Sequence, residues 1–385
     1  MKKIVILMRA FECGGTETAL LTMLKYLDYT KYEVEIYCLL KSGPLLEKVP
    51  EQVKVREIEF RHHFYNYASD VQYHRLNSFE ILLSKVEKRL IKLKRQADKP
   101  YFYMNLKLLK DNSLHCDILL DFFGYGSFLT AYGANIVIAQ KKATWIHDER
   151  MSWLSRTSNY LKAYDKVFCV SKAVKNKFDS IYPQYAEKSD VFYNLLDVDM
   201  IRQKSLEDSL KIEKNKIWIV TVGRLALQKG YDMAAKAAAI LKQKGYDFLW
   251  LALGDGSERA LVESWIQENQ VEDCFKLMGR VDNPYPYIRK ADLYVQTSYN
   301  EGYGLAIAEA KILGKLVVST DLNCVREQIC NGKNGFLVEQ DPEKIAGKIE
   351  ECLNSPKMVS QITDTLQKEN FDYVEELSHI YNLLI

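Results

Sequence analysis

Two carboxylates in one short stretch, Glu301 and Glu309, are the residues best suited to chemistry. They stand in SYNEGYGLAIAEAKILGK, residues 298–315, with seven residues between them. A carboxylate accepts hydrogen bonds from hydroxyl groups, and a pair of acids can also cleave a glycoside. The pair therefore predicts a ligand rich in hydroxyl groups.

The pair belongs to a segment that we expect to form a strand, a loop, a helix and a second strand. Residues 293–298 give the first strand, residues 299–304 the loop, and the helix ends at Gly314. The N–H groups at its start, from Gly302 to Leu305, are unsatisfied and favour an anion at the carboxyl end of the strand. A phosphate between two hydroxyl-binding acids is the layout of a sugar nucleotide. In the alternative, Glu301 fills a helix N-terminus and Glu309 is a surface acid.

Two cations follow another strand, in VTVGRLALQKG at residues 220–230. Arg224 can grip phosphate with two parallel hydrogen bonds, and Lys229 adds a mobile positive charge, so together they suit a diphosphate. A pair of solvated loop residues is the alternative.

The N-terminal half offers weaker signals. Gly14 and Gly15 follow the first strand and permit close approach of the backbone to a ligand, but a dinucleotide fingerprint needs a third glycine. His147, in TWIHDER, is expected at the end of another strand, and a lone histidine is more often structural. Asp197 and Asp199 form a DxD, which we place in the interdomain crossing rather than at a metal.

Strand-like runs alternate with helical runs along most of the chain. The strands that we expect are residues 4–8, 32–40, 116–123, 135–140, 166–171, 218–223, 248–254, 293–298 and 316–320. Such runs predict βαβ units whose parallel strands are buried on both faces. The fold class is therefore α/β, with two Rossmann-like, doubly wound domains.

Strand signals stop near residue 197, which we take as the domain boundary. Residues 1–197 form the first domain and residues 198–368 the second. A helix over residues 369–385 is expected to pack back on the first domain, because Tyr373, Leu377 and Ile380 fall near helical spacing.

Residues 60–110 break the α/β rhythm. Within them, residues 79–95 place Lys and Arg around an apolar stripe, which predicts a basic amphipathic helix. One interpretation is contact with an anionic membrane face or a lipid-linked anion. The other is an ordinary helix with a solvated basic face, and the stripe alone does not separate them.

Composition excludes several classes of protein. A formal net charge of +2 over 385 residues argues against a nucleic-acid binder. No uncharged apolar stretch approaches the ~20 residues that span a bilayer, and the N-terminal apolar run, Ile4 to Met8, is too short for a signal peptide. The 8 cysteines are scattered, as in a reducing cytosol. We expect a cytoplasmic protein, with contact at the inner face of the cell membrane left open.

The order of three motifs resembles family 4 of the retaining glycosyltransferases. These are GGxE at residues 14–17, GRL…KG at residues 223–230 and EGYGLAIAEA…G at residues 301–314. The Glu-x7-Glu spacing of Glu301 and Glu309 is a hallmark of that family. The resemblance covers most of the second domain, through residue 338, and only patches of the first. It implies the GT-B architecture of two facing Rossmann-like domains.

The resemblance also implies roles for the residues. Arg224 and Lys229 hold the donor diphosphate, Glu309 the ribose, and Glu301 the transferred sugar, which His147 approaches from the first domain. The expected catalytic residues are Glu301, His147, Arg224 and Lys229, and the expected donor-binding residues are Gly14, Gly15, Arg224, Lys229, Arg280, Val281, Glu301, Gly302, Tyr303, Gly304, Leu305 and Glu309.

Two departures from the family pattern bear most on the prediction of which donor is used. Leu195 stands where the family often has glycine, and the glycine pair that often precedes Glu327 is missing.

The expected activity is retaining transfer of a hexose-type sugar from a UDP-sugar to a hydroxyl of a glycan or lipid-linked saccharide. We expect no metal and no cofactor beyond this donor, and growth of a surface polysaccharide such as a capsule. Three alternatives stay open: a glycoside hydrolase, a nucleotide-sugar epimerase and a non-catalytic nucleotide-binding scaffold.

Overall fold

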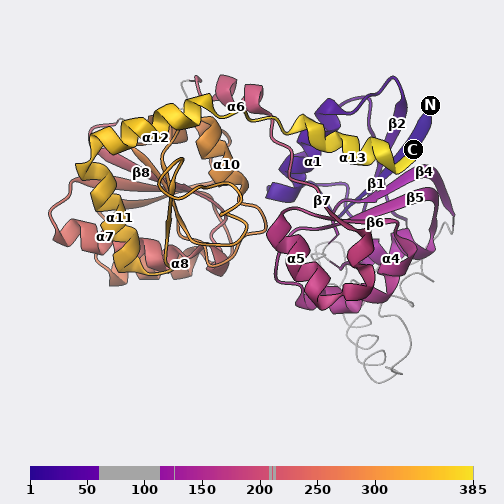
Figure 1. Ribbon diagram of the computed structural model, residues 1–385, viewed down its shortest axis with the longest axis horizontal. Helices are drawn as coiled ribbons and strands as arrows, with labels where there is room; N and C mark the ends of the chain where they lie inside the picture. The colour runs from indigo at the N-terminus through magenta and orange to yellow at the C-terminus, as the bar shows by residue number, and fades with distance from the viewer. Residues whose placement is uncertain (60–112, 125, 208–209, 211–213, 385) are drawn as a thin grey trace, which may run out of the picture. The chain divides into compact units, whose positions relative to one another are not determined.

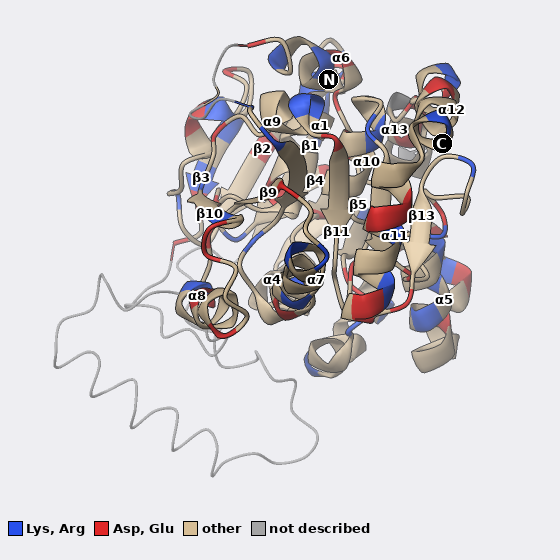
Figure 2. Cartoon of the chain, turned by 90° about the vertical axis from the view of Figure 1, so that its left-hand side faces the viewer, with Lys and Arg blue, Asp and Glu red and all other residues tan. Residues whose placement is uncertain are grey.

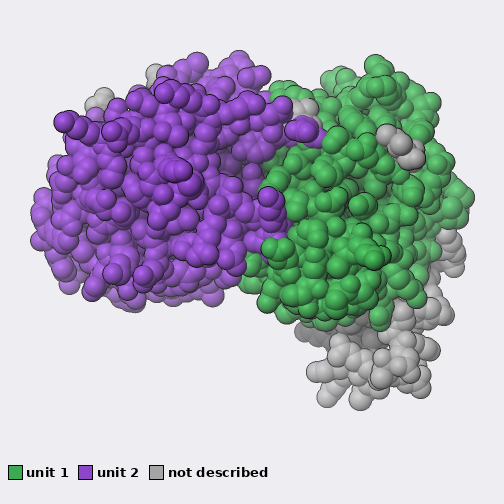
Figure 3. Space-filling model, in the orientation of Figure 1, with its two compact units in different colours: residues 1–170, 174–195, 376–385 green, residues 171–173, 196–375 purple. Residues whose placement is uncertain are grey.

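The structure is a computed structural model that describes residues 1–59, 113–124, 126–207, 210 and 214–384. It divides into two compact units (Figure 3). Unit 1 holds residues 1–170, 174–195 and 376–385, and unit 2 holds residues 171–173 and 196–375. The basic amphipathic helix expected at residues 79–95 lies outside the described residues, so it stays a prediction.

Unit 1 is built on a parallel sheet whose described strands have the order β3-β2-β1-β4-β5-β6-β7. The strand order reverses between β1 and β4, as in a doubly wound fold. The strands are β1 (Lys2–Met8), β2 (Tyr32–Cys38), β3 (Lys54–Glu57), β4 (Leu114–Asp121), β5 (Val137–Ile146), β6 (Lys166–Cys169) and β7 (Ser189–Val191).

Helices join the strands of unit 1 (Figure 1), together with short 3-10 turns. The helices are α1 (Gly15–Tyr26), α4 (Phe128–Asn135) and α5 (Lys172–Ile181), and the 3-10 turns are η1 (Leu46–Lys48), η3 (Ser152–Arg156), η4 (Ser158–Ala163) and η5 (Pro183–Lys188). Ser127 caps α4, since its hydroxyl accepts a hydrogen bond from Leu129 N–H at 3.2 Å.

The C-terminal segment from residue 376 onward also belongs to unit 1. Its helix α13 is confined to Leu377–Tyr381, with the 3-10 turns η7 (Val374–Glu376) and η8 (Asn382–Leu384) beside it, so it is shorter than the helix expected over residues 369–385. Tyr381 stacks on Tyr32 with 5.5 Å between ring centroids, and its hydroxyl accepts a bond from Asp28 N–H. These contacts fix the end of the chain against β2.

Unit 2 is built on a second parallel sheet, with the order β10-β9-β8-β11-β12-β13 for its described strands. The strands are β8 (Ile217–Val222), β9 (Phe248–Leu253), β10 (Phe275–Gly279), β11 (Leu293–Gln296), β12 (Val317–Thr320) and β13 (Phe336–Val338). Figure 2 shows β11 in tan, since none of its residues is charged. Here the order reverses between β8 and β11. The predicted α/β class with two doubly wound parallel sheets is confirmed.

The helices of unit 2 cover its sheet (Figure 1). They are α6 (Val198–Lys204), α7 (Tyr231–Gln243), α8 (Arg259–Glu268), α9 (Tyr285–Lys290), α10 (Leu305–Ile312), α11 (Pro342–Asn354) and α12 (Pro356–Lys368), with the 3-10 turn η6 (Leu227–Lys229). Apolar side chains of α7, α8, α11 and α12 join those of the strands in one core, while α6, α9 and α10 contact one another.

Two strand predictions need correction. Residues 135–140 and the apolar run before His147 were expected as separate strands, but they form the single strand β5. Lys141 and Lys142 interrupt its apolar pattern because their amino groups reach polar partners: Lys142 Nζ donates to Gly133 O at 2.8 Å. The short strands β3, β7, β10 and β13 were not predicted.

Candidate functional site

The candidate site of unit 2 lies where the order of its strands reverses. Arg224 and Lys229 follow β8, and Glu301 follows β11, which is the neighbour of β8 in the sheet. In an open α/β sheet, ligands bind at the carboxyl ends of the strands beside such a reversal. The topology therefore brings the two predicted motifs to one place.

The loops after β8 and β11 are bonded to each other. Thr297 Oγ1 donates to Lys229 O at 3.0 Å, and Tyr299 N–H donates to Gln228 O at 2.7 Å. Gly230 starts α7 with φ +62°, and a Cβ on it would lie 2.0 Å from Thr297 O. Only glycine permits both this left-handed backbone and this close approach.

Lys229 and Glu301 meet at the centre of the site. Lys229 Nζ lies 2.6 Å from Glu301 Oε1, and the two side chains are 15% and 8% exposed. Ser298 Oγ donates to the same oxygen at 2.7 Å. Low exposure strengthens an ion pair, because water screens it less. The structure thus joins a predicted phosphate-binding cation to a predicted sugar-binding acid.

Glu309 lies one turn into α10 and is buried. Tyr285 donates its hydroxyl to Glu309 Oε1 at 3.1 Å. Burial raises the pKa of Glu309 from 4.5 to about 7, and the bond from Tyr285 opposes that rise. Burial and the neighbouring carboxylate also raise the pKa of Tyr285. Near neutral pH, Glu309 is therefore divided between its protonated and ionised forms.

The glycine loop before α10 is held from several sides. Gly304 caps the helix with φ +90°, and Cys324 Sγ donates to Glu301 O at 3.3 Å. Ser171 Oγ donates to Gly302 O at 2.8 Å, and the Gln328 amide donates to Tyr303 O. With its carbonyl groups engaged in this way, the loop is fixed in front of the N-terminus of Leu305–Ile312.

Arg280 and Val281 follow β10 at the same edge of the sheet. Gly254 N–H donates to Gly279 O at 2.8 Å, and a Cβ on Gly254 would lie 2.0 Å from Gly223 O. The ends of β8, β9 and β10 are thus in close backbone contact. Arg280 and Arg224 are exposed, and Val281 is half-buried.

The candidates of unit 1 lie at the carboxyl ends of their own strands. Gly14 is the residue before α1, where a Cβ would lie 2.5 Å from Glu17 Oε2, and Gly15 is the first residue of the helix. His147 directly follows β5 and is buried. The roles expected for these residues opposite the donor stay predictions.

His147 is held as a neutral ring. Its Nε2 lies 2.7 Å from Phe122 O, and a carbonyl only accepts hydrogen bonds, so Nε2 carries the proton. Burial lowers the pKa of His147 to about 4. At neutral pH the ring therefore carries no charge, and Nδ1 is its unprotonated nitrogen.

One of the two DxD residues, Asp197, has a local role in the structure. Asp197 caps α6, since its carboxylate accepts a hydrogen bond from Met200 N–H at 3.0 Å. Within the described residues, no three His, Cys, Asp or Glu side chains are grouped as metal ligands would be.

Several buried polar residues of the site were not predicted from the sequence. They are Ser298, Gln296 and Tyr294 beneath Glu301, and Tyr285 beside Glu309. The first three had a signal, because polar side chains alternate with others along an otherwise buried strand. Tyr285 had none, since it meets Glu309 only through the fold.

A known protein family matches the part of the chain that carries this site. Residues 202–369 match the family model described as Glycosyl transferases group 1. The matched stretch contains Arg224, Lys229, Glu301 and Glu309, whereas Gly14, Gly15 and His147 lie outside it.

Known glycosyltransferases are also similar to this chain over part of their length. The chain is 32% identical over 158 residues to the N-acetylgalactosamine-N,N'-diacetylbacillosaminyl-diphospho-undecaprenol 4-alpha-N-acetylgalactosaminyltransferase of Campylobacter jejuni, covering 41% of this chain and 42% of that protein. It is 28% identical over 247 residues to the amylovoran biosynthesis glycosyltransferase AmsK of Erwinia amylovora, covering 60% of each. The chain spans about half the length of the curated relatives that it matches.

A solved structure shares the whole fold. The crystal structure of Anabaena HepE in complex with UDP and glucose superposes with a TM-score of 0.72 at 19% identity, covering 100% of this chain and 99% of that one. At this identity the likeness shows the fold alone. The GT-B architecture expected from the sequence is confirmed.

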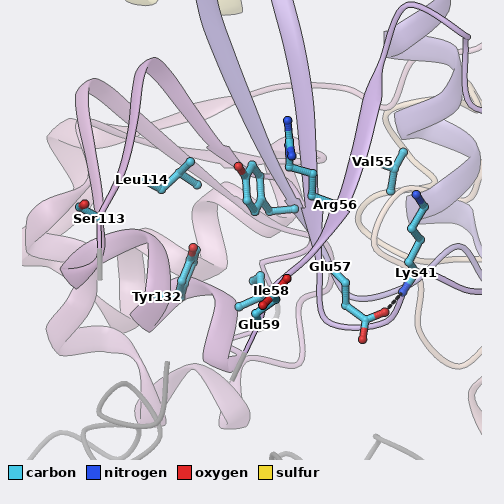
Figure 4. Close-up of a pocket in the computed structure, with 10 residues that line it drawn as sticks. Lys41, Val55, Arg56, Glu57, Ile58, Glu59, Ser113, Leu114 and Tyr132 are labelled. Atoms are coloured by element: carbon cyan, nitrogen blue, oxygen red, sulfur yellow. Dashed lines mark hydrogen bonds between the residues drawn. The ribbon is translucent and has the colours of Figure 1, made fainter. Parts of the chain in front are cut away.

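Unit 1 also holds a cavity of about 500 Å³ (Figure 4). Its polar lining comes from Tyr37, Lys41, Arg56, Glu57, Glu59, Ser113 and Tyr132. Lys41 N–H donates to Glu57 Oε2 at 2.9 Å, the bond drawn in Figure 4. None of the predicted site residues lines this cavity, so it is separate from the candidate site.

One property bears on membranes. In the described ranges, which leave out residues 60–112, no helix combines the length and the hydropathy needed to cross a bilayer.

Proposed function

We propose that this chain is a retaining glycosyltransferase that transfers a hexose-type sugar from a UDP-sugar to a hydroxyl of a glycan or lipid-linked saccharide. One observation carries the proposal: Lys229 and Glu301 meet at 2.6 Å at the carboxyl ends of β8 and β11, inside the stretch that matches the glycosyltransferase family model. A cation beside an acid, next to a helix N-terminus, suits a sugar joined to a diphosphate.

The donor would bind along the carboxyl edge of the sheet of unit 2. Arg224, Lys229 and the N–H groups of Gly304 and Leu305 would receive the diphosphate, because all are donors or positive charges at that edge. Glu309 would accept the ribose hydroxyls. Arg280 and Val281 would meet the base, and Gly302 and Tyr303 would lie beside the sugar.

Transfer begins when the bond between the sugar and the diphosphate breaks. Negative charge then grows on the leaving phosphate, and Arg224, Lys229 and the start of α10 stabilise that charge without a required metal. Glu301 accepts hydroxyls of the sugar and orients it. The leaving phosphate takes the acceptor proton on the same face of the sugar, so the anomeric configuration is retained and no covalent intermediate forms.

Unit 1 would complete the reaction. The loop of Gly14 and Gly15 would approach the phosphates, and His147 would accept a sugar hydroxyl at Nδ1, since its Nε2–H is given to Phe122 O. A neutral acceptor suits a hydroxyl that donates.

The acceptor is proposed from the relatives. The Campylobacter protein is named for a diphospho-undecaprenol substrate and the Erwinia protein for amylovoran biosynthesis. HepE is described in complex with UDP and glucose. By analogy we place this chain in surface polysaccharide synthesis, such as that of a capsule, on the cytoplasmic side, with residues 79–95 as a contact for an anionic membrane.

The test is a panel of nucleotide sugars measured by thermal shift and then by turnover. A UDP-sugar should raise Tm and be consumed, whereas GDP- and ADP-sugars should not. Glu301→Ala or Lys229→Ala should lower turnover at least a hundredfold while the fold survives, and NMR of the product should show the α-linkage of an α-donor. Near-normal turnover in either variant, or an inverted product, would refute the proposal.

A further inference from the structure

One strand of unit 2 carries polar side chains where an apolar run is expected. Tyr294, Gln296 and Ser298 occupy alternate positions, so they share one face of β11 and its continuation. They are 0%, 1% and 0% exposed. Parallel strands buried on both faces are usually apolar, and a buried polar group costs free energy unless it is bonded. These residues therefore need a reason to be polar.

Hydrogen bonds join these side chains into a chain that ends at Glu301. Val222 N–H donates to Tyr294 Oη at 3.4 Å, and the Tyr294 hydroxyl donates to Gln296 Oε1 at 2.8 Å. Gln296 Nε2 donates to Ser298 Oγ at 2.9 Å. Ser298 Oγ then donates to Glu301 Oε1 at 2.7 Å. The single proton of the Tyr294 hydroxyl has two acceptors, Val222 O at 3.4 Å and Gln296 Oε1 at the shorter distance of 2.8 Å. Because an ionised carboxylate only accepts, Gln296 and Ser298 donate toward Glu301.

The end of this chain coincides with the ion pair. Lys229 Nζ and Ser298 Oγ both bond Glu301 Oε1, at 2.6 and 2.7 Å. In the part of the chain that the structure describes, neither an ion pair nor a hydrogen bond reaches Oε2. One carboxylate oxygen is thus anchored twice, and Oε2 takes part in neither anchor.

We propose that Ser298, oriented by Gln296 and Tyr294, is a positioning residue that holds Glu301 for the donor sugar. The inference rests on the proposed function. A donor diphosphate attracts Lys229 Nζ, which weakens one of the two anchors on Oε1. The Ser298 hydroxyl keeps the other, because Gln296 bonds it from behind, and Oε2 then accepts a sugar hydroxyl from a fixed position.

A purely structural role is the competing explanation, and the neighbouring threonines show what such a role looks like. Thr221 Oγ1 donates to Val295 O at 2.6 Å, and Thr320 Oγ1 donates to Ser298 O at 2.6 Å. Both are fully buried hydroxyls bonded to backbone carbonyls of β11 or its continuation. Ser298 differs, since its hydroxyl ends on the carboxylate beside Lys229.

The test compares Ser298→Ala with Thr320→Val, a matched buried hydroxyl that does not touch Glu301. The probes are UDP-glucose, UDP-galactose and UDP-N-acetylglucosamine, with water as acceptor and UDP release as the rate, and UDP alone for calorimetric binding. Ser298→Ala should lower kcat for the best UDP-sugar about tenfold to a hundredfold. Its Kd for UDP should stay within about threefold, because UDP carries no sugar for Glu301 to hold. Thr320→Val should keep kcat within about threefold.

Two further variants separate the outcomes. Ser298→Thr, which keeps the hydroxyl, should recover most of the rate, and Gln296→Leu should lower kcat about threefold to tenfold even if Ser298→Ala fails to fold. A kcat near that of the wild type in Ser298→Ala, or in Gln296→Leu where Ser298→Ala does not fold, would overturn the positioning role alone. So would an equal loss of UDP affinity and kcat. A wild-type protein that binds UDP and consumes no UDP-sugar would overturn the proposed function and this inference together.

Discussion

Removing the charge of Glu309 should strengthen the fold and weaken donor binding at the same time. Glu309 is 9% exposed, and its pKa is raised from 4.5 to about 7 by burial. In Glu309→Gln the amide oxygen can still accept the bond from Tyr285, so the substitution changes charge more than shape. The two expected effects therefore have one physical origin.

The effect on stability follows from proton linkage. The folded state holds the Glu309 proton more tightly than the unfolded chain does, so its contribution is full below pH 4.5 and is lost as pH rises through about 7. The shift from 4.5 to about 7 corresponds to about 3 kcal/mol above pH 7. Glu309→Gln should raise the free energy of unfolding of unit 2 by up to that amount at pH 8, and by almost nothing at pH 4.

The effect on binding has the opposite sign. Ribose hydroxyls bond an ionised carboxylate more strongly than a protonated one. With a pKa of about 7, Glu309 is ionised in about 10% of molecules at pH 6 and about 90% at pH 8. The Kd of the wild-type protein for UDP-glucose should therefore fall about tenfold over this range. The Kd of Glu309→Gln should be larger and nearly independent of pH.

Two measurements check both signs. Urea titration at pH 4 and pH 8 gives the stability, and calorimetry with UDP-glucose from pH 6 to pH 8 gives Kd. UDP-glucose is preferred to UDP because it lacks the terminal phosphate that titrates near pH 6. His147 stays neutral over this range, since its pKa is about 4. A wild-type Kd that does not change with pH, or a variant less stable at pH 8, would refute the reasoning.

Two other predictions follow from buried groups. Tyr285→Phe removes a bond that lowers the pKa of Glu309, so the pH midpoint of UDP-glucose binding should move up by about one pH unit; an unmoved midpoint in calorimetry would contradict this. Asp121 is wholly buried, and burial raises its pKa from 3.8 to about 6. Its contribution to the stability of unit 1 is therefore lost as pH rises through that window. Asp121→Asn should therefore stabilise unit 1 by up to about 3 kcal/mol at pH 8 and little at pH 4, and urea midpoints that fall at pH 8 would show that its bonds from Thr130 and Thr144 outweigh the charge.

The central strands could be read from the sequence, and the edges could not. Runs such as residues 4–8 and 218–220 are continuously apolar because parallel strands inside a doubly wound sheet are buried on both faces. The strands β3, KVRE, and β7, SDV, lie at sheet edges, where all their side chains except that of Ser189 are exposed or half-exposed, so they carry no such run. In β5 the run is broken by lysines whose stems pack while their amino groups find partners.

In the site, too, the sequence predicts what depends on neighbouring residues and does not predict what depends on contacts between distant segments. The spacing of Glu301 and Glu309 is local, since Glu301 lies in the loop before the short helix α10 and Glu309 lies within that helix. Their chemistry is not local, because each acid takes its properties from other segments: Glu301 from Lys229 and Ser298, Glu309 from burial and Tyr285. Two identical side chains thus become different groups, one anchored beside a cation and one poised near neutral pH. A donor that joins a sugar to a ribose through a diphosphate needs that difference, because its two polyol ends lie on opposite sides of the same negative charge.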